Sequence, residues 1–208
     1  MKTRYRNTLN ADQWLTREQL KAVLAYVRKR ATDRPVRLTA TDRLIVETLV
    51  YTGIRRQELC NLDLQDLPMH HGHPAIQVRH GKRGSFRTIP IPKALAELLW
   101  LYVKQWRCDD GPKAPLFVGR SPDYGRLKAK VVYQKIVRIG RRALGIHLHP
   151  HVLRHSSAMV NYGCGRNIHS TKEMLGHRDI RTTLIYLRTT EGIEAAIANE
   201  MWDALETG

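Results

Sequence analysis

A histidine, an arginine and a tyrosine in the carboxyl-terminal third of the chain have side chains suited to work on a phosphate ester. His151 and Arg154 are three residues apart, so on a helix they lie on one face and can both reach one anion. Arginine offers a planar fork for two phosphate oxygens, and histidine donates hydrogen bonds and titrates near neutral pH. Alone, such a pair is more often two surface residues, and Tyr186, beside Leu184 and Leu187, is more often a core aromatic.

Five sequence blocks, taken in order and with their spacing, resemble the tyrosine recombinase (phage integrase) family. The stretch HPHVLRH at residues 149–155 is followed, 23 residues after its arginine, by the histidine of an LGH triplet, and nine residues later by a tyrosine. TGIRRQEL at residues 52–59 resembles the family's arginine box, and GKRGSFRTIPI at residues 81–91 resembles its β-hairpin. The resemblance covers residues 15–188. It implies that the catalytic residues are Arg55, Lys82, His151, Arg154, His177 and Tyr186, with Glu58 as an accessory acid.

This resemblance implies a site-specific recombinase that cuts and rejoins DNA through a bond between a tyrosine and a 3′ phosphate. Attack on a phosphodiester creates a crowded, charged state that needs cations and donors at its nonbridging oxygens, and the two arginines and the histidines supply them. A tyrosine ordinarily has a pKa near 10, so Tyr186 needs a base or a cationic pocket. Lys82 is the expected general acid at the departing 5′ oxygen. The aryl phosphate stays reactive, so no ATP, metal or other cofactor is expected.

Two other function classes remain open. A type IB topoisomerase-like enzyme would share the tyrosine, arginines and lysine, and would relax supercoiled DNA without paired sites. A noncatalytic DNA-binding regulator would keep the charge and lose the chemistry, which the five intact blocks argue against. Within the site, Arg56 competes with Arg55 for the first arginine, and the phase of the TGIRRQEL block favours Arg55. Arg83 likewise stands beside Lys82.

Histidine and cysteine spacing raises the alternative of a metal site. The histidines form two clusters, His70, His71 and His73, and His147, His149 and His151. No cysteine or carboxylate stands at a matching spacing, and the second cluster already belongs to the HPHVLRH block, so no metal is expected. Cys60, Cys108 and Cys164 are too far apart in sequence to suggest a disulfide clip, and reduced thiols in a cytosol are the simplest interpretation.

The charge of the chain indicates a polyanionic partner. Lysines and arginines number 35 against 19 acids, which gives a net charge of +16. Residues 120–190 hold 14 of these cations and three acids, an excess of 11. Counterion release from nucleic acid rewards such clustering, so double-stranded DNA is the expected partner. The alternatives are a solvated basic surface and a membrane-binding surface, but no basic amphipathic helix with a Trp/Phe face is present, and no membrane partner is expected.

Periodicity and capping signals predict a mainly α fold with a small antiparallel β-sheet (α+β), the DNA breaking-rejoining catalytic fold of the family that the chain resembles. Helices are predicted over residues 16–30, from 41 or 42 to Gly53, over 54–59, 93–106 and 127–144, and as short pieces over 151–187. Residues 75–79 and 86–91 predict the hairpin, and 116–118 a short edge strand. Leu44, Ile45, Thr48 and Leu49 should point inward.

The chain is expected to comprise a basic lead (residues 1–14), a catalytic domain (15–190) and an amphipathic tail helix (191–208). The tail places Ile193, Ile197, Met201 and Leu205 on one face. Relatives commonly pass this helix to a neighbouring protomer, so the resemblance implies self-association on DNA as a dimer or tetramer, and an accessory DNA-bending protein is a further expected partner. Packing of the tail on its own core is equally open.

Most relatives carry a separate helical domain ahead of the catalytic one, whereas here about 15 residues precede the first predicted helix. The chain is therefore expected to be a natural single-domain form, similar to the fimbrial phase-switch invertases, or a truncated piece. Either form should bind DNA weakly or with a partner. No run of residues is long and apolar enough to span a bilayer, and the expected location is the cytoplasm, at the nucleoid.

Overall fold

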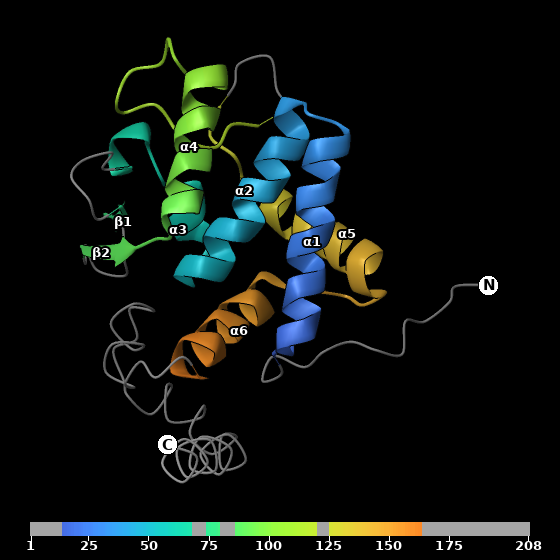
Figure 1. The fold of residues 1–208 in the computed structure, drawn as a ribbon. Helices are drawn as coiled ribbons and strands as arrows, with labels where there is room; N and C mark the ends of the chain where they lie inside the picture. The colour runs from blue at the N-terminus through green and yellow to red at the C-terminus, as the bar shows by residue number, and fades with distance from the viewer. Residues whose placement is uncertain (1–13, 68–73, 80–85, 120–124, 164–208) are drawn as a thin grey trace, which may run out of the picture.

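Helices dominate the structure, a computed structural model that describes residues 14–67, 74–79, 86–119 and 125–163 (Figure 1). One two-stranded antiparallel sheet accompanies them in these residues. In chain order the elements are α1 (Arg17–Asp33), α2 (Arg37–Thr52), α3 (Arg56–Cys60), the 3₁₀ turn η1 (Leu64–Asp66), β1 (Ala75–Val78), β2 (Arg87–Pro90), α4 (Lys93–Trp106), α5 (Ala129–Leu144) and α6 (Pro150–Gly163). The predicted α+β class is confirmed. The predicted tail helix, the short helices predicted after residue 163 and nearly all of the predicted basic lead lie outside the described residues.

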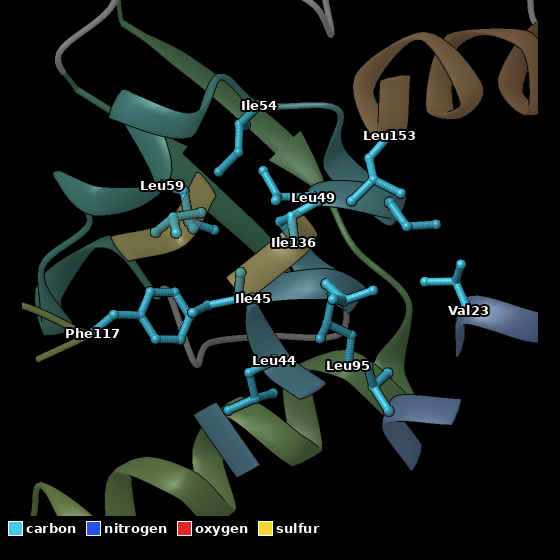
Figure 2. Close-up of a cluster of buried hydrophobic side chains, with 14 of the residues drawn as sticks. Val23, Leu44, Ile45, Leu49, Ile54, Leu59, Leu95, Phe117, Ile136 and Leu153 are labelled. Atoms are coloured by element: carbon cyan, nitrogen blue, oxygen red, sulfur yellow. The ribbon is translucent and has the colours of Figure 1, made fainter. Parts of the chain in front are cut away.

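Helix α2 is the centre of the fold. It packs against α1, α3, α4, α5 and α6, and Figure 1 shows α1 and α4 on either side of it and α6 across its carboxyl-terminal end. A helix surrounded in this way must be apolar on most of its circumference. Leu44, Ile45, Thr48 and Leu49 are all buried, as predicted. Ile45 and Leu49 lie among side chains from α1, α3, α4, α5 and α6 in the core of Figure 2.

Several helix boundaries follow from local capping chemistry. Thr16 caps α1 through its side chain, which accepts from the Gln19 backbone, while the Gln19 side chain accepts from the Thr16 backbone. Helix α2 ends at Gly53, whose φ of 60° is left-handed and suits glycine. The capping box, this end and the bounds of α4 at residues 93 and 106 are confirmed.

The predicted start of the second helix at residue 41 or 42 is wrong. Helix α2 begins at Arg37, because the Thr39 hydroxyl accepts from the backbone amide of Val36 and caps the first turn. Thr41 lies inside the helix and its hydroxyl donates to the Arg37 carbonyl. Asp42 is buried and pairs with Lys135 and with two arginines, Arg30 and Arg138. Thr41 and Asp42 therefore do not cap the helix, and Asp42 instead pairs with cations from other helices.

The predicted edge strand at residues 116–118 is also wrong. Leu116 donates its amide to the carbonyl of Leu62, whereas the carbonyl of Phe117 accepts from Leu127. The neighbouring residues Pro115 and Val118 form isolated bridges with two different segments, at Asp63 and at Arg126, so no ladder extends. The Leu116 and Phe117 side chains are fully buried, which explains the apolar run that suggested a strand.

The predicted hairpin is confirmed in its two strands. Ala75 pairs with Pro90 and Val78 with Arg87, which brackets an antiparallel ladder. Ile76 and Ile89 face each other across it and point into the core. The turn at residues 80–85 lies outside the described residues. Within the described part of the chain, no helix has the length and apolar character needed to cross a membrane.

Candidate active site

Helix α6 brings Arg154 to the end of α2. Pro150 occupies its first position, where proline's missing N–H costs nothing, and the His149 carbonyl accepts the amide of Val152 at 3.0 Å. Arg154 is buried, with 5% of its surface exposed, and its Nη1 donates to the carbonyl of Gly53 at 2.5 Å. The Arg154 guanidinium is therefore bound to Gly53, which stands two residues before Arg55 in the chain.

Arg55 is fixed by Glu58 of its own helix. As the N-cap of α3, Arg55 donates its backbone amide to Oε2 of Glu58 at 2.7 Å, and its Nη1 donates to Oε1 at 3.0 Å. The Glu58 side chain is 4% exposed, whereas that of Arg55 is 35% exposed. Glu58 is thus a buried anchor, and Arg55 presents part of its guanidinium to solvent.

A second arginine, Arg87 on β2, donates hydrogen bonds to the same carboxylate. Its Nη1 and Nη2 donate to the two oxygens of Glu58 at 3.0 and 2.8 Å, a bidentate pair with only 13% of the Arg87 side chain exposed. Burial raises the pKa of Glu58, but the hydrogen bonds from Arg87 and the Arg55 amide, with both positive charges, outweigh it and hold the pKa below its ordinary value. Glu58 is therefore an ionised bridge between the arginine box and the hairpin.

The hairpin is anchored at the turn ends of both strands. Arg79, directly after β1, pairs with Asp66 and donates Nη2 to Asp63 at 2.8 Å. Arg126 holds the other oxygen of Asp63 at 2.6 Å. Arg79, the described residue nearest the turn on the β1 side, is thus tied to Asp63 and Asp66 around η1, and Arg87, the first residue of β2, is tied to Glu58 of α3.

The arginines and histidines line one cleft of about 610 Å³. Its described lining residues are Ile54, Arg55, Arg56, Gln57, Tyr133, His149, Pro150, His151, Val152, Arg154 and His155. None of them is acidic. The cleft therefore presents three guanidinium groups and three imidazoles, and its chemistry suits a phosphate diester.

His151 lies at the rim of this cleft. Partial burial, followed by the positive charges of Arg154, Arg56 and Arg55, lowers its pKa from the ordinary value. The imidazole is consequently neutral near pH 7 and able to accept a proton. Its ring centroid lies 6.4 Å from that of His155.

The structure brings together four of the seven predicted site residues: Arg55, Glu58, His151 and Arg154. The other three, Lys82, His177 and Tyr186, lie outside the described residues, so their positions and roles stay predictions. Within the histidine cluster at 147, 149 and 151, the rings of His147 and His149 are in tilted contact, with centroids 4.5 Å apart. Among the described residues, no group of three or more His, Cys, Asp or Glu side chains is arranged to hold a metal ion.

Sequence reasoning missed Arg87 and Tyr133. Arg87 carries no local signal, because the carboxylate with which it pairs stands 29 residues earlier in the chain. Tyr133, on α5, lies against Arg56 and against the rings of His147 and His149. No local pattern joins these segments, since only the packing of α3 on α5 does so.

The helical fold, its hairpin and its arginine-lined cleft are those of a tyrosine recombinase catalytic domain. A crystal structure of XerA recombinase superposes with a TM-score of 0.74 at 26% identity, covering 90% of this chain and 64% of that one. XerH bound to palindromic difH substrate, a post-cleavage complex, gives 0.73 at 24% identity over 93% and 54%. The sequence matches the phage integrase family over residues 13–192. The chain belongs to this family.

Among curated relatives, the tyrosine recombinase XerA of Pyrococcus furiosus is 40% identical over 177 residues, which is 85% of this chain and 57% of that protein. The chain thus spans little more than half the length of this relative.

Proposed function

We propose that this chain supplies the chemistry of a site-specific DNA recombinase, cutting and rejoining strands through a phosphotyrosyl intermediate. The observation that carries the proposal is the convergence of Arg55, Arg154 and His151 in one cleft whose described lining residues include no acid. A phosphodiester in this cleft meets two guanidinium groups that are already held by Glu58 and Gly53. Preorganised cations of this kind stabilise developing charge without reorganising during the reaction.

In the proposed step, the phenol oxygen of Tyr186 attacks the phosphorus atom as the bond to the 5′ oxygen breaks. The phenol proton passes to a base, for which neutral His151 is the described candidate. Lys82 delivers a proton to the departing 5′ oxygen, and His177 donates to a nonbridging oxygen. The product is a 3′-phosphotyrosyl ester and a free 5′ hydroxyl. Attack by another 5′ hydroxyl reverses the step and joins the strands.

Formation of a covalent adduct tests the proposal. Wild-type protein is incubated with a random-sequence library of nicked duplexes. Cleavage near the nick releases a short fragment that carries the free 5′ hydroxyl, and its loss by diffusion prevents rejoining and traps the intermediate. An SDS-stable adduct is expected, and sequencing the trapped DNA reports the preferred site. Tyr186→Phe should form none, whereas Tyr26→Phe, which alters a half-buried tyrosine on α1, should react normally. Absence of an adduct, or its persistence in Tyr186→Phe, would refute the mechanism.

Arg154 offers a second test of the chemistry. Arg154→Lys keeps the positive charge and loses the fork that reaches both Gly53 and a ligand. Loss of one transition-state donor lowers rates by about 10²–10³-fold, so adduct formation should slow by that order. Relaxation of supercoiled plasmid without recombinant products would point instead to a topoisomerase-like activity.

We propose that the working unit is a dimer or tetramer on DNA, with an accessory DNA-bending protein as a further partner, acting at the nucleoid. The apolar face of Ile193, Ile197, Met201 and Leu205 supports a contact with a second protomer. Comparing the solution mass of the full chain with that of a variant lacking residues 191–208, each with and without DNA, tests this. A mass that does not depend on the tail would contradict it.

A further inference from the structure

We propose that Arg56, which packs on a cluster of aromatic rings, forms a second phosphate subsite beside the catalytic residues. It binds the phosphate next to the scissile one on the same strand. The inference rests on the proposed function, since it names a further contact for the same DNA. It also gives a role to the arginine that competes with Arg55 in the sequence.

The aromatic cluster consists of Tyr133 on α5 and of His147 and His149 in the segment before α6, and Arg56 of α3 lies on it. The guanidinium carbon of Arg56 lies over the ring of Tyr133, 5.7 Å from its centroid. The Tyr133 ring lies 5.7 Å from that of His149 and 6.3 Å from that of His147, with the His147 contact edge-on at 71°. The Tyr133 hydroxyl is also 3.4 Å from Nε2 of His147. The Tyr133 ring, packed against the rings of His147 and His149, therefore forms a pedestal under the Arg56 guanidinium.

This arrangement favours a phosphate over a base as the ligand. A nucleic-acid base would need an open aromatic face, but Arg56 covers one face of Tyr133 and the histidines pack against the same ring. A guanidinium stacked on a ring uses its flat side, whereas its five N–H donors lie in its plane. Those donors suit the oxygens of a phosphate.

The position of Arg56 favours a phosphate of the cleaved strand. Arg56, Tyr133 and His149 line the same cleft as Arg55, His151 and Arg154, and no described lining residue is acidic. Arg55 and Arg56 have separate supports, Glu58 for Arg55 and Tyr133 for Arg56, so each can hold its own phosphate while both line the same cleft.

Salt dependence of DNA binding tests the subsite. The affinity of a labelled duplex of arbitrary sequence is measured over a range of salt concentrations for wild type and Arg56→Ala. Loss of one phosphate contact should weaken binding by about tenfold and reduce the slope of log affinity against log salt by about 0.9. Arg56→Lys should keep the slope because it keeps the charge.

Three further variants separate the subsite from general effects. Tyr133→Leu removes the pedestal and should reproduce part of the loss, whereas Tyr133→Phe keeps the ring and should bind like wild type. Lys104→Ala is the matched control, because Lys104 also lies over a ring, that of Trp100 at 5.0 Å, but lines no part of the cleft. It removes the same charge and should leave the slope unchanged.

Adduct formation with the nicked duplexes distinguishes failure of this inference from failure of the proposed function. Arg56→Ala should need about tenfold more DNA for half-maximal adduct formation, with a smaller effect on the rate at saturation. If wild type forms the adduct and Arg56→Ala binds DNA with the wild-type slope, the subsite is wrong and the function stands. If wild type forms no adduct while the slope still depends on Arg56, the function is wrong and the phosphate subsite stands.

Discussion

Replacing Arg87 with methionine should both destabilise the protein and slow DNA cleavage, because Arg87 holds Glu58 in place. The change removes two charge-assisted hydrogen bonds, of 3.0 and 2.8 Å, from a carboxylate that is 4% exposed. A buried charge left with no partner costs about 3–5 kcal/mol. Glu58 keeps two bonds from Arg55, so the expected loss of unfolding free energy is smaller, about 2–3 kcal/mol.

Calorimetry and denaturant titration measure this loss. At about 2–4 °C per kcal/mol for a domain of this size, the melting temperature should fall by about 4–12 °C. The double variant Arg87→Met, Glu58→Gln should recover part of the loss, because no buried carboxylate then needs a partner. Additive effects of the two substitutions would refute the proposed coupling, and so would wild-type stability of Arg87→Met.

The effect on cleavage separates positioning from stability. Without Arg87, only Arg55 still holds the carboxylate that orients it, so Arg55 and Glu58 can shift together. Misplacement of a catalytic group by about 1 Å can cost about 10²-fold in rate. Arg43→Met is the matched control, since Arg43 donates at 2.9 Å to Glu47, another carboxylate with only 2% exposure, in a part of the fold that does not line the cleft. Arg43→Met should be less stable than wild type. At a temperature below the melting temperature of the variant, it should cleave DNA at the same rate as wild type. Equal rates for the two variants would show that Arg87 acts only on stability.

Three further predictions concern packing, protonation and thiol reactivity. A Cβ added at Gly140 would lie 2.2 Å from that of Leu148. Gly140→Ala should therefore lower the free energy of unfolding, measured by urea titration, by about 1–3 kcal/mol. An unchanged urea midpoint would show that α5 can move away from Leu148. Because the folded state lowers the pKa of His151, wild-type stability should fall as pH drops below about 6.5, and His151→Gln should show a shallower fall in that range; parallel curves would contradict this. Burial raises the pKa of Cys60 to about 11, so iodoacetamide at about pH 8 should label exposed Cys108 in the native protein and Cys60 only after unfolding, as peptide mass spectrometry can establish; native labelling of Cys60 would argue against its burial.

The sequence predicted what local chemistry determines. The Thr16 capping box, the bounds of α4 and the hairpin strands depend on neighbours in the chain, and the structure confirms them. The spacing of the blocks also identified Arg55, Glu58, His151 and Arg154, which the fold brings to one region. Their catalytic roles stay predictions, as do those of the site residues beyond the described part of the chain.

The remaining features depend on contacts between distant segments. Asp42 looked like a helix cap because its type and position fit one, but its partners are contributed by α1 and α5. Arg87 gave no signal because a strand arginine is ordinarily exposed, and only the docking of the hairpin on α3 supplies its carboxylate. Tyr133 likewise acquires its place from the packing of α5 on α3. Pairing of charges and rings across the chain is not encoded in any short window.

The placement of the acids explains how a protein with a net charge of +16 keeps its cations ordered. Five acids in the described residues are buried, namely Asp42, Glu47, Glu58, Asp63 and Asp66. Four of them each bind at least two cations, so every shared carboxylate orients more positive charge than it neutralises. Acids spread over the surface would instead weaken the attraction of a polyanion and leave the arginines to reorganise when it binds. The buried acids therefore serve binding and folding together: they anchor the arginines from inside and leave the cleft positive.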